Sequence, residues 1–397
     1  MKKLLHIALV TETWRPEING VAMTLGRLTD GLRQRGHRFT LVRPRQHAKD
    51  IPAAEENLTE ILVGGCPLPG YRDLRFGLPS KSRLLEAWRS DRPDIIQVAT
   101  EGPLGASAIA AAHALDIPVA SEFHTNFHAY SHHYGLGWLE GLVSAHLRRL
   151  HNKSAVTLAP TFAVANELSA KGYRSVRVVS RGVDTSLFNP ARRSDTLRAS
   201  AWNVDKEQLV IAYVGRLAAE KNLPLVTRTF AAIRAVRPDA RLLLVGDGPL
   251  RRELERSDAA YLFAGMRRDE DLATHYASAD MFLFPSLTET FGNVTTEALA
   301  SGLGVVAYDR AAAGELIRDG DNGRIVPAGN EALFISAAVE LARNPEFLTA
   351  LRQRAANSVR HLDWTTISGD LDLLLRETIH THERQNRIIP TFRFAPD

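Results

Sequence analysis

The sequence predicts an α/β protein made of two doubly wound domains. Short apolar runs alternate with helix-like stretches along the chain, and the runs are continuous rather than alternately polar and apolar. Such runs indicate parallel strands in sheets that helices cover on both faces. The length of 397 residues agrees, because one hydrophobic core rarely serves so long a chain.

The expected strands form two successive sets, with helical segments such as Gly20–Arg35 and Pro103–Leu115 between them. In the first half we expect strands at Leu4–Val10, Arg38–Val42, Ile95–Val98, Val119–Glu122, Val156–Ala159 and Val176–Val179. In the second half we expect them at Val210–Val214, Arg241–Val245, Tyr261–Ala264, Met281–Phe284 and Val305–Tyr308. The opening MKKLLHIALV is expected to be a buried strand rather than a signal peptide, because TETWRP follows without a small-residue cleavage site.

A polar stretch with a proline, residues 185–208, interrupts this rhythm and sets the predicted domain boundary. We therefore expect a first domain at 1–184, a linker at 185–208 and a second domain at 209–362. The remainder, 363–397, is expected to be a helix and tail, with a return to the first domain as one option. Two such Rossmann-like halves facing one another would hold ligands at the carboxyl ends of their strands.

The composition is that of an ordinary globular protein, with 45% apolar and 24% charged residues. A net charge of +4 suits anionic ligands or lipids without indicating either, and the chain lacks the basic runs expected of nucleic-acid binding. The single cysteine, Cys66, cannot form an internal disulfide, which favours the cytoplasm. No segment is long and apolar enough to span a bilayer.

The most informative stretch is ETFGNVTTE, in which two carboxylates flank a glycine where a strand turns into a helix. Backbone N–H groups at such a helix start can bind anions or hydroxyl oxygens, here those of Phe291, Gly292, Asn293 and Val294. Glu289 could accept hydrogen bonds from sugar hydroxyls, and Glu297 could hold a cis-diol such as ribose. The plain alternative is that Glu297 complements the helix dipole and Glu289 is a solvated acid.

Three further features lie between strands and helices. Arg216 and Lys221 follow a strand, where two cations suit a diphosphate leaving group, although they could be surface cations. Gly246 and Gly248 form a GxG turn, a weak signal because Arg251 stands where a dinucleotide fingerprint needs glycine. Gly20 opens a helix near the N-terminus and offers another approach for a phosphate.

Together these features resemble the retaining glycosyltransferases of family four, which have the GT-B fold. The resemblance extends from about Leu4 to Leu362 and includes the specific pairing of an E-x7-E element with GR…EK after a strand. It is carried by PEINGV at 16–21, EFHTNF at 122–127, SRGVDTSLFNP at 180–190, GRLAAEKN at 215–222, VGDGP at 245–249 and ETFGNVTTEALASG at 289–302.

The resemblance implies a nucleotide-sugar donor held by the second domain and an acceptor held by the first. Arg216 and Lys221 would bind the donor diphosphate. Glu289 and the Phe291–Val294 amides would hold the sugar, and Glu297 the ribose. Gly20 would lie beside the β-phosphate, and His124 would contact the transferring sugar near its reacting face.

The resemblance also implies transfer with retention, in which the leaving phosphate accepts the proton of the attacking hydroxyl and no enzymatic nucleophile takes part. We expect neither a metal nor another cofactor. The DxD triplets at 269–271, 319–321 and 370–372 do not follow a strand near the donor residues. His124, His128 and His132 are spaced by four, but no HExxH accompanies them.

The acceptor is less well defined. The branch of glycolipid synthases and GDP-mannose-dependent mannosyltransferases looks most similar, which supports a lipid or glycan hydroxyl, glycolipid or cell-envelope glycan synthesis, and a cytoplasmic location. The helix expected within 137–153 carries an apolar face beside Arg148, Arg149 and Lys153. It could lie on the inner face of an anionic membrane, although a core-facing helix with solvated arginines is the favoured interpretation.

Several alternatives stay open from the residues alone. The donor could be GDP-mannose or a UDP-hexose such as UDP-glucose. A GT-B sugar-nucleotide epimerase would use the same kind of site without an acceptor, and a binding protein would hold the nucleotide sugar without catalysis. A nicotinamide oxidoreductase is disfavoured, because the full GxGxxG is missing.

Overall fold

The computed structural model describes residues 3–17, 20–47, 49–68, 71–124, 140–289 and 291–388. The chain divides into two compact units. The first unit comprises Met1–Ser180 with Trp364–Asp397, and the second comprises Arg181–Asp363. The bounds of the first unit's elements are β1 His6–Val10, α1 Gly20–Gln34, β2 Arg38–Pro44, β3 Ala54–Glu55, β4 Leu58–Val63, β5 Gly65–Leu68, β6 Tyr71–Gly77, α2 Lys81–Ser90, β7 Ile95–Val98, α3 Pro103–Ala114, β8 Val119–Glu122, α5 Glu140–His151, β9 Val156–Ala159, α6 Phe162–Ala170, β10 Val176–Val178 and α14 Trp364–Ile388.

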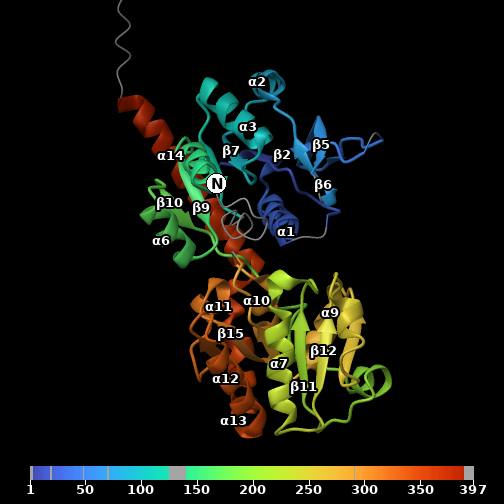
Figure 1. Ribbon diagram of the computed structural model, residues 1–397. Helices are drawn as coiled ribbons and strands as arrows, with labels where there is room; N and C mark the ends of the chain where they lie inside the picture. Colours follow the sequence, from blue (N-terminus) through green and yellow to red (C-terminus); the bar gives the residue numbers. More distant parts are fainter. Residues whose placement is uncertain are drawn as a thin grey trace, which may run out of the picture. The chain divides into compact units, whose positions relative to one another are not determined.

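The first unit is built on an 8-stranded sheet with the order β10-β9-β8-β7-β1-β2-β4-β3. Its strands are parallel except for the short β3, and β5 pairs with β6 in a separate antiparallel ribbon. The helices α2 and α3 pack together on one face, and α1 packs with α14 on the other (Figure 1). The strand order reverses between β1 and β7, so ligand-binding residues are expected at the carboxyl ends of these strands.

The C-terminal helix α14 belongs to the first unit although it follows the second in sequence. Leu371 and Leu375 are buried, and Asp372 Oδ1 lies 3.1 Å from Nε2 of His37. Arg376 donates to the carbonyl oxygen of Lys3 at 2.7 Å. The helix is therefore fastened by both apolar packing and polar contacts. Among the described residues, no helix has the length and apolar character needed to cross a membrane.

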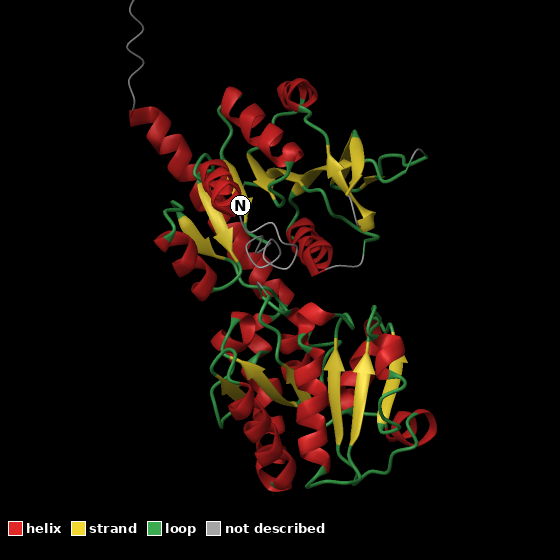
Figure 2. Cartoon of the chain, in the orientation of Figure 1, coloured by secondary structure: helices red, strands yellow, loops and turns green. Residues whose placement is uncertain are grey.

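The second unit has a 6-stranded parallel sheet with the order β13-β12-β11-β14-β15-β16. Its helices cover both faces, with α7 packed on α12 and α9 packed on α10 (Figures 1 and 2). The order reverses between β11 and β14. The bounds are η2 Pro190–Arg192, η3 Leu197–Ala201, β11 Val210–Val214, η4 Ala219–Lys221, α7 Leu223–Arg234, β12 Arg241–Val245, α8 Arg251–Leu254, β13 Tyr261–Gly265, α9 Asp269–Ser278, β14 Met281–Phe284, α10 Asn293–Ala300, β15 Gly304–Tyr308, α11 Ala311–Leu316, β16 Arg324–Val326, α12 Glu331–Arg343, α13 Pro345–Ser358 and η5 Arg360–Leu362.

The segment 185–208, which the sequence suggested as a linker, lies within the second unit. Arg198 is buried, donates to the carbonyl oxygens of Ser278 at 2.8 Å and Gln208 at 2.6 Å, and lies 3.3 Å from Oδ2 of Asp280. Arg193 lies 3.1 Å from the other oxygen of Asp280. These guanidinium groups satisfy carbonyl oxygens that α9 leaves unpaired at its C-terminus. Polar residues therefore fasten this segment instead of loosening it.

Candidate functional site

Two loops of the second unit meet where its strand order reverses. The loop at 215–222 follows β11, and the loop at 285–292 follows β14, the neighbouring parallel strand. Asn222 adopts a left-handed conformation, with φ of 55°, and its Nδ2 donates to the carbonyl oxygen of Pro285 at 3.3 Å. The two loops are thus joined at the carboxyl edge of the sheet, the position where doubly wound domains bind ligands.

Lys221 and Glu289, predicted from separate motifs, form an ion pair across these loops. Ser286 donates from Oγ to the same carboxylate oxygen of Glu289 at 3.2 Å. The two charged side chains are 22% and 21% exposed. This partial burial fixes the direction of both groups and still leaves each accessible. A cation and a hydroxyl acceptor are therefore held side by side.

Arg216 is more exposed than Lys221, with 53% of its side chain accessible. Its Nη1 lies 3.5 Å from Oε1 of Glu220, a surface pair that constrains the guanidinium little. Its backbone is fixed, because the buried hydroxyl of Tyr213 donates to the Arg216 carbonyl oxygen at 3.2 Å. The loop is therefore held in place while the guanidinium can turn towards an anion.

The start of α10 has the form expected of a binding site for oxygen atoms. Gly292 caps the helix with φ of 85°, a left-handed conformation that suits glycine. The first N–H groups of α10, which include those of Asn293 and Val294, have no acceptor within a helix. Oδ1 of Asn293 is buried without a partner among the described residues. Phe291, just before the cap, is buried.

Glu297 lies one turn further along α10 and is 8% exposed. Its Oε2 accepts a hydrogen bond of 3.0 Å from the hydroxyl of Tyr276. Burial raises the pKa of Glu297 to about 7, and the Tyr276 hydrogen bond opposes that rise. The carboxylate is thus a buried acceptor with a fixed direction, which is more than a solvated residue complementing a helix dipole.

Gly246 and Gly248 have a structural explanation. A Cβ atom at Gly246 would lie 2.0 Å from the carbonyl oxygen of Gly215, and one at Gly248 would lie 2.4 Å from that of Leu217. These glycines let the loop after β12 pack against the loop that carries Arg216. A donor-binding role for either glycine stays a prediction.

In the first unit, Gly20 is the exposed first residue of α1. His124 follows β8, is buried, and places Nε2 2.6 Å from Oε2 of Glu122. Gln97 of β7 donates to the other oxygen of Glu122. His124 is therefore oriented by a carboxylate that the neighbouring strand holds. The predicted His128 and His132 lie outside the described residues, and no metal-binding cluster occurs among the residues described.

Two notable residues escaped the sequence analysis. Glu12 lies two residues after the end of β1 and accepts a hydrogen bond from the Gly77 N–H at 3.3 Å. Burial raises the pKa of Glu12 to about 7. A Cβ atom at Gly102 would lie 2.2 Å from Oε1 of Glu12, so the glycine admits this carboxylate to the start of α3. Arg181 is buried with its guanidinium carbon 5.7 Å from the Phe291 ring centroid. An acid two residues after a predicted strand was the available signal for Glu12.

The helix α5 has buried residues on one side and exposed apolar and basic residues elsewhere. Leu147 and Leu150 are buried and face the core, while Leu142 is 69% exposed and Val143 is partly exposed. Arg148 and Arg149 are exposed on the same helix. Trp138 and Leu139, also part of the predicted apolar face, lie outside the described residues.

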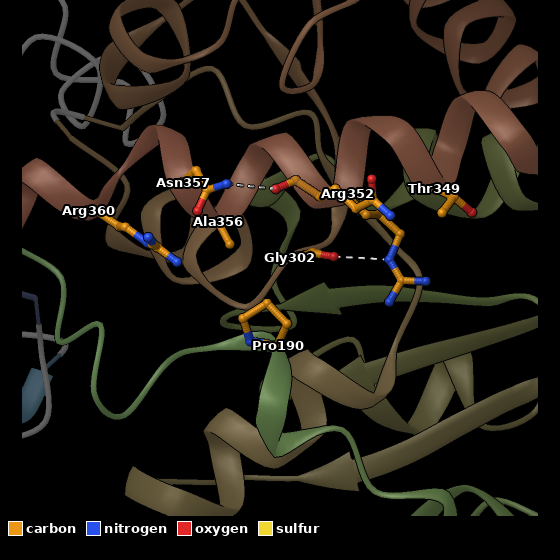
Figure 3. Close-up of a pocket in the computed structure, with 8 residues that line it drawn as sticks. Pro190, Gly302, Thr349, Arg352, Ala356, Asn357 and Arg360 are labelled. Carbon is orange, nitrogen blue, oxygen red and sulfur yellow. Dashed lines mark hydrogen bonds between the residues drawn. The ribbon is translucent and has the colours of Figure 1, made fainter.

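A cavity of about 360 Å³ lies at the opposite, amino-terminal edge of the second sheet (Figure 3). It lies between α13 and the turn at Gly302, which precedes β15, and Arg352 donates from Nε to the Gly302 carbonyl oxygen at 3.0 Å. Its lining is Pro190, Gly302, Thr349, Arg352, Gln353, Ala356, Asn357 and Arg360, which includes none of the predicted site residues.

Comparisons with known proteins identify the family of the chain. A family model described as "Glycosyltransferase Family 4" matches residues 18–187, and one described as "Glycosyl transferases group 1" matches residues 208–344. A GDP-mannose-dependent alpha-mannosyltransferase of Mycobacterium tuberculosis is 33% identical over 92% of this chain and 95% of its own. An alpha-monoglucosyldiacylglycerol synthase of Streptococcus pneumoniae is 28% identical, over 79% of this chain and 74% of its own.

Among solved structures, Anabaena HepE in complex with UDP and glucose superposes with a TM-score of 0.71 at 18% identity, covering 94% of this chain and all of that one. This likeness confirms the expected GT-B fold. The matched family models, the extensive similarity to the mycobacterial relative and the paired loops after β11 and β14 lead to one conclusion. The chain belongs to the family 4 glycosyltransferases and has the GT-B fold.

Proposed function

We propose that the enzyme transfers mannose from GDP-mannose to a hydroxyl group of a lipid acceptor, with retention and without a metal ion. The observation that carries the proposal is the Lys221–Glu289 pair beside the start of α10, at the carboxyl edge of the second sheet. The mycobacterial relative is named as GDP-mannose-dependent, which favours this donor. A UDP-hexose is the second candidate, because HepE binds UDP and glucose.

The donor roles follow from chemistry and accessibility. Lys221 and Arg216 supply the positive charge that a departing diphosphate needs, because the largest developing charge lies on phosphate oxygens. Glu289 accepts hydrogen bonds from sugar hydroxyls, and the N–H groups of Phe291 to Val294 donate to sugar oxygens. Glu297 accepts from the ribose hydroxyls. In the first unit, Gly20 lies beside the β-phosphate and His124 contacts the transferring sugar.

The reaction then needs no protein nucleophile. The bond between the anomeric carbon and the diphosphate oxygen breaks, and the acceptor oxygen forms its bond on the same face. The leaving phosphate takes the hydroxyl proton. The two cations substitute for the metal ion that other transferases use on the diphosphate, which is the physical basis for proposing metal independence.

Two observations support a lipid acceptor. The streptococcal relative is named as a diacylglycerol glycolipid synthase. In α5, the exposed Leu142 and Val143 share a helix with Arg148 and Arg149, a composition suited to the surface of an anionic membrane. We therefore propose a lipid acceptor in glycolipid synthesis, reached from the cytoplasmic face of a membrane.

The test is transfer of radiolabelled mannose from GDP-mannose to a bacterial lipid extract in the presence of EDTA. A labelled glycolipid that depends on both enzyme and lipid supports the proposal. Donor isomerised without lipid would indicate an epimerase, and donor bound but unchanged would indicate a binding protein. Label transferred from UDP-glucose alone would replace the donor and keep the reaction class.

A further inference from the structure

Tyr276 is a buried tyrosine on α9 that contacts Glu297 on α10, the residue proposed to bind the ribose. Its side chain is 0% exposed, and its hydroxyl donates to Oε2 of Glu297 at 3.0 Å. Its ring centroid lies 5.8 Å from that of Phe188 in an edge-on arrangement and 5.9 Å from that of Phe282. Phe188 comes from the SRGVDTSLFNP motif, for which the donor roles gave no explanation.

The hydroxyl group is not needed for packing. Aromatic neighbours on both sides would hold a phenylalanine equally well, and a buried hydroxyl is costly unless it has a partner. Its partner is Glu297, and among the described residues Tyr276 is the one donor to that carboxylate. The hydrogen bond fixes Oε2 of Glu297, and therefore the direction in which the rest of the carboxylate can accept hydrogen bonds. A vicinal diol requires such an arrangement, because both of its hydroxyls must donate at once.

The hydrogen bond from Tyr276 also affects the ionisation of Glu297. The elements packed against α10 carry two charged or titratable groups that pair elsewhere, His275 with Asp271 on α9 and Arg352 on α13 with Asp280. On β15, Tyr308 packs its ring against Phe334. The remaining packed element, α11, carries Glu315. Burial disfavours the ionised form of Glu297, and the Tyr276 hydroxyl favours it.

We propose that Tyr276 is a positioning residue for donor binding, which holds the Glu297 carboxylate in the direction that accepts both ribose hydroxyls, with Phe188 bracing its ring. The inference rests on the proposed function, since it takes Glu297 as the ribose ligand. It assigns a role to the segment that follows residue 180: Phe188 supports the donor site through the tyrosine.

The experiment compares GDP binding to the wild-type enzyme and to Tyr276→Phe by calorimetry. We expect about a tenfold weaker affinity near pH 7, the scale of a hydrogen bond to a charged group. Wild-type affinity should fall as pH falls through about 7, because protonated Glu297 cannot accept both hydroxyls. In Tyr276→Phe the same fall should occur at higher pH, since the variant lacks the group that favours ionisation.

Two controls separate positioning from packing. Tyr308 is also buried, and its hydroxyl has no partner among the described residues, so Tyr308→Phe should bind GDP like the wild type. With 2′,3′-dideoxy-GDP, which lacks the diol, the wild type and Tyr276→Phe should bind equally. An equal loss with GDP and with the dideoxy compound would overturn the inference, because it would show a general disturbance of the site.

The proposed function and the positioning role of Tyr276 can be refuted separately. If the wild-type enzyme binds neither GDP nor UDP, the proposed function fails and the role of Tyr276 fails with it. If the wild type binds GDP, Glu297→Gln weakens that binding and Tyr276→Phe does not, the ribose site stands and the positioning role is wrong.

Discussion

Replacing Arg216 with alanine isolates the electrostatic part of the proposed chemistry. The guanidinium is 53% exposed and lies 3.5 Å from Glu220, so its loss should change the free energy of unfolding by no more than about 0.5 kcal/mol. If it stabilises the departing diphosphate, its loss should raise the activation free energy by about 2.7–4 kcal/mol, a fall of about 10²–10³-fold in turnover. Activity should therefore fall steeply while stability hardly changes.

The assay is steady-state transfer of labelled mannose, with thermal unfolding measured on the same samples. Arg228 on α7 provides the matched control, because its side chain is 54% exposed and pairs with Glu331 of α12 at 2.6 Å. Arg228→Ala should keep wild-type turnover. The reasoning is refuted if Arg216→Ala keeps wild-type turnover, or if both variants lose activity alike.

Four further predictions follow from named contacts. Glu297→Ala should raise the KM for the donor more than it lowers kcat, because ribose is held alike before and during transfer; a kcat loss with unchanged KM would contradict the ribose role. Gly246→Ala should destabilise the second unit by about 1–3 kcal/mol in urea unfolding, because the methyl group would meet a carbonyl oxygen 2.0 Å away; an unchanged midpoint would contradict this. Glu122→Gln should lower kcat without changing GDP affinity, since it frees His124, and equal kcat would remove that role. Burial raises the pKa of Glu12 from 4.5 to about 7, so the folded state binds the proton more tightly and the free energy of unfolding should fall as pH rises between these values. Glu12→Gln should reduce this fall by about 1–3 kcal/mol over the interval, and an identical pH dependence in the variant would contradict the role of Glu12.

The sequence was most informative where one physical pattern dominates. Every strand expected from a continuous apolar run is present, and most of these strands are buried along nearly their whole length, as such runs predict. The missed strands are short or mixed in character: the ribbon of β5 and β6, the edge strands β3 and β16, and β4, which lies next to the edge strand β3 and is only partly buried. An edge strand exposes part of its surface, so its residues need not be apolar.

The candidate site shows the same division. Lys221 and Glu289 were each predicted from local motifs, and their ion pair follows from the pairing of β11 with β14, which no local pattern encodes. The partner of Glu297 was not predicted, because Tyr276 lies on another helix. The hold on His124 was not predicted either, because its partner Glu122 is fixed by Gln97 from another strand. The segment 185–208 looked like a linker since its polar residues carry no sign of burial, yet Arg198 is among the most buried side chains of the described chain.

We propose that the loops after β11 and β14 hold a nucleoside diphosphate without a metal ion. The most direct measurement is calorimetric titration of GDP and UDP, with EDTA present, into the wild-type enzyme and Lys221→Met. The account predicts selective binding of one nucleotide by the wild type and at least about tenfold weaker binding by the variant, as expected when a charged partner is lost. Absence of binding by the wild type, or equal affinity in the variant, would contradict it.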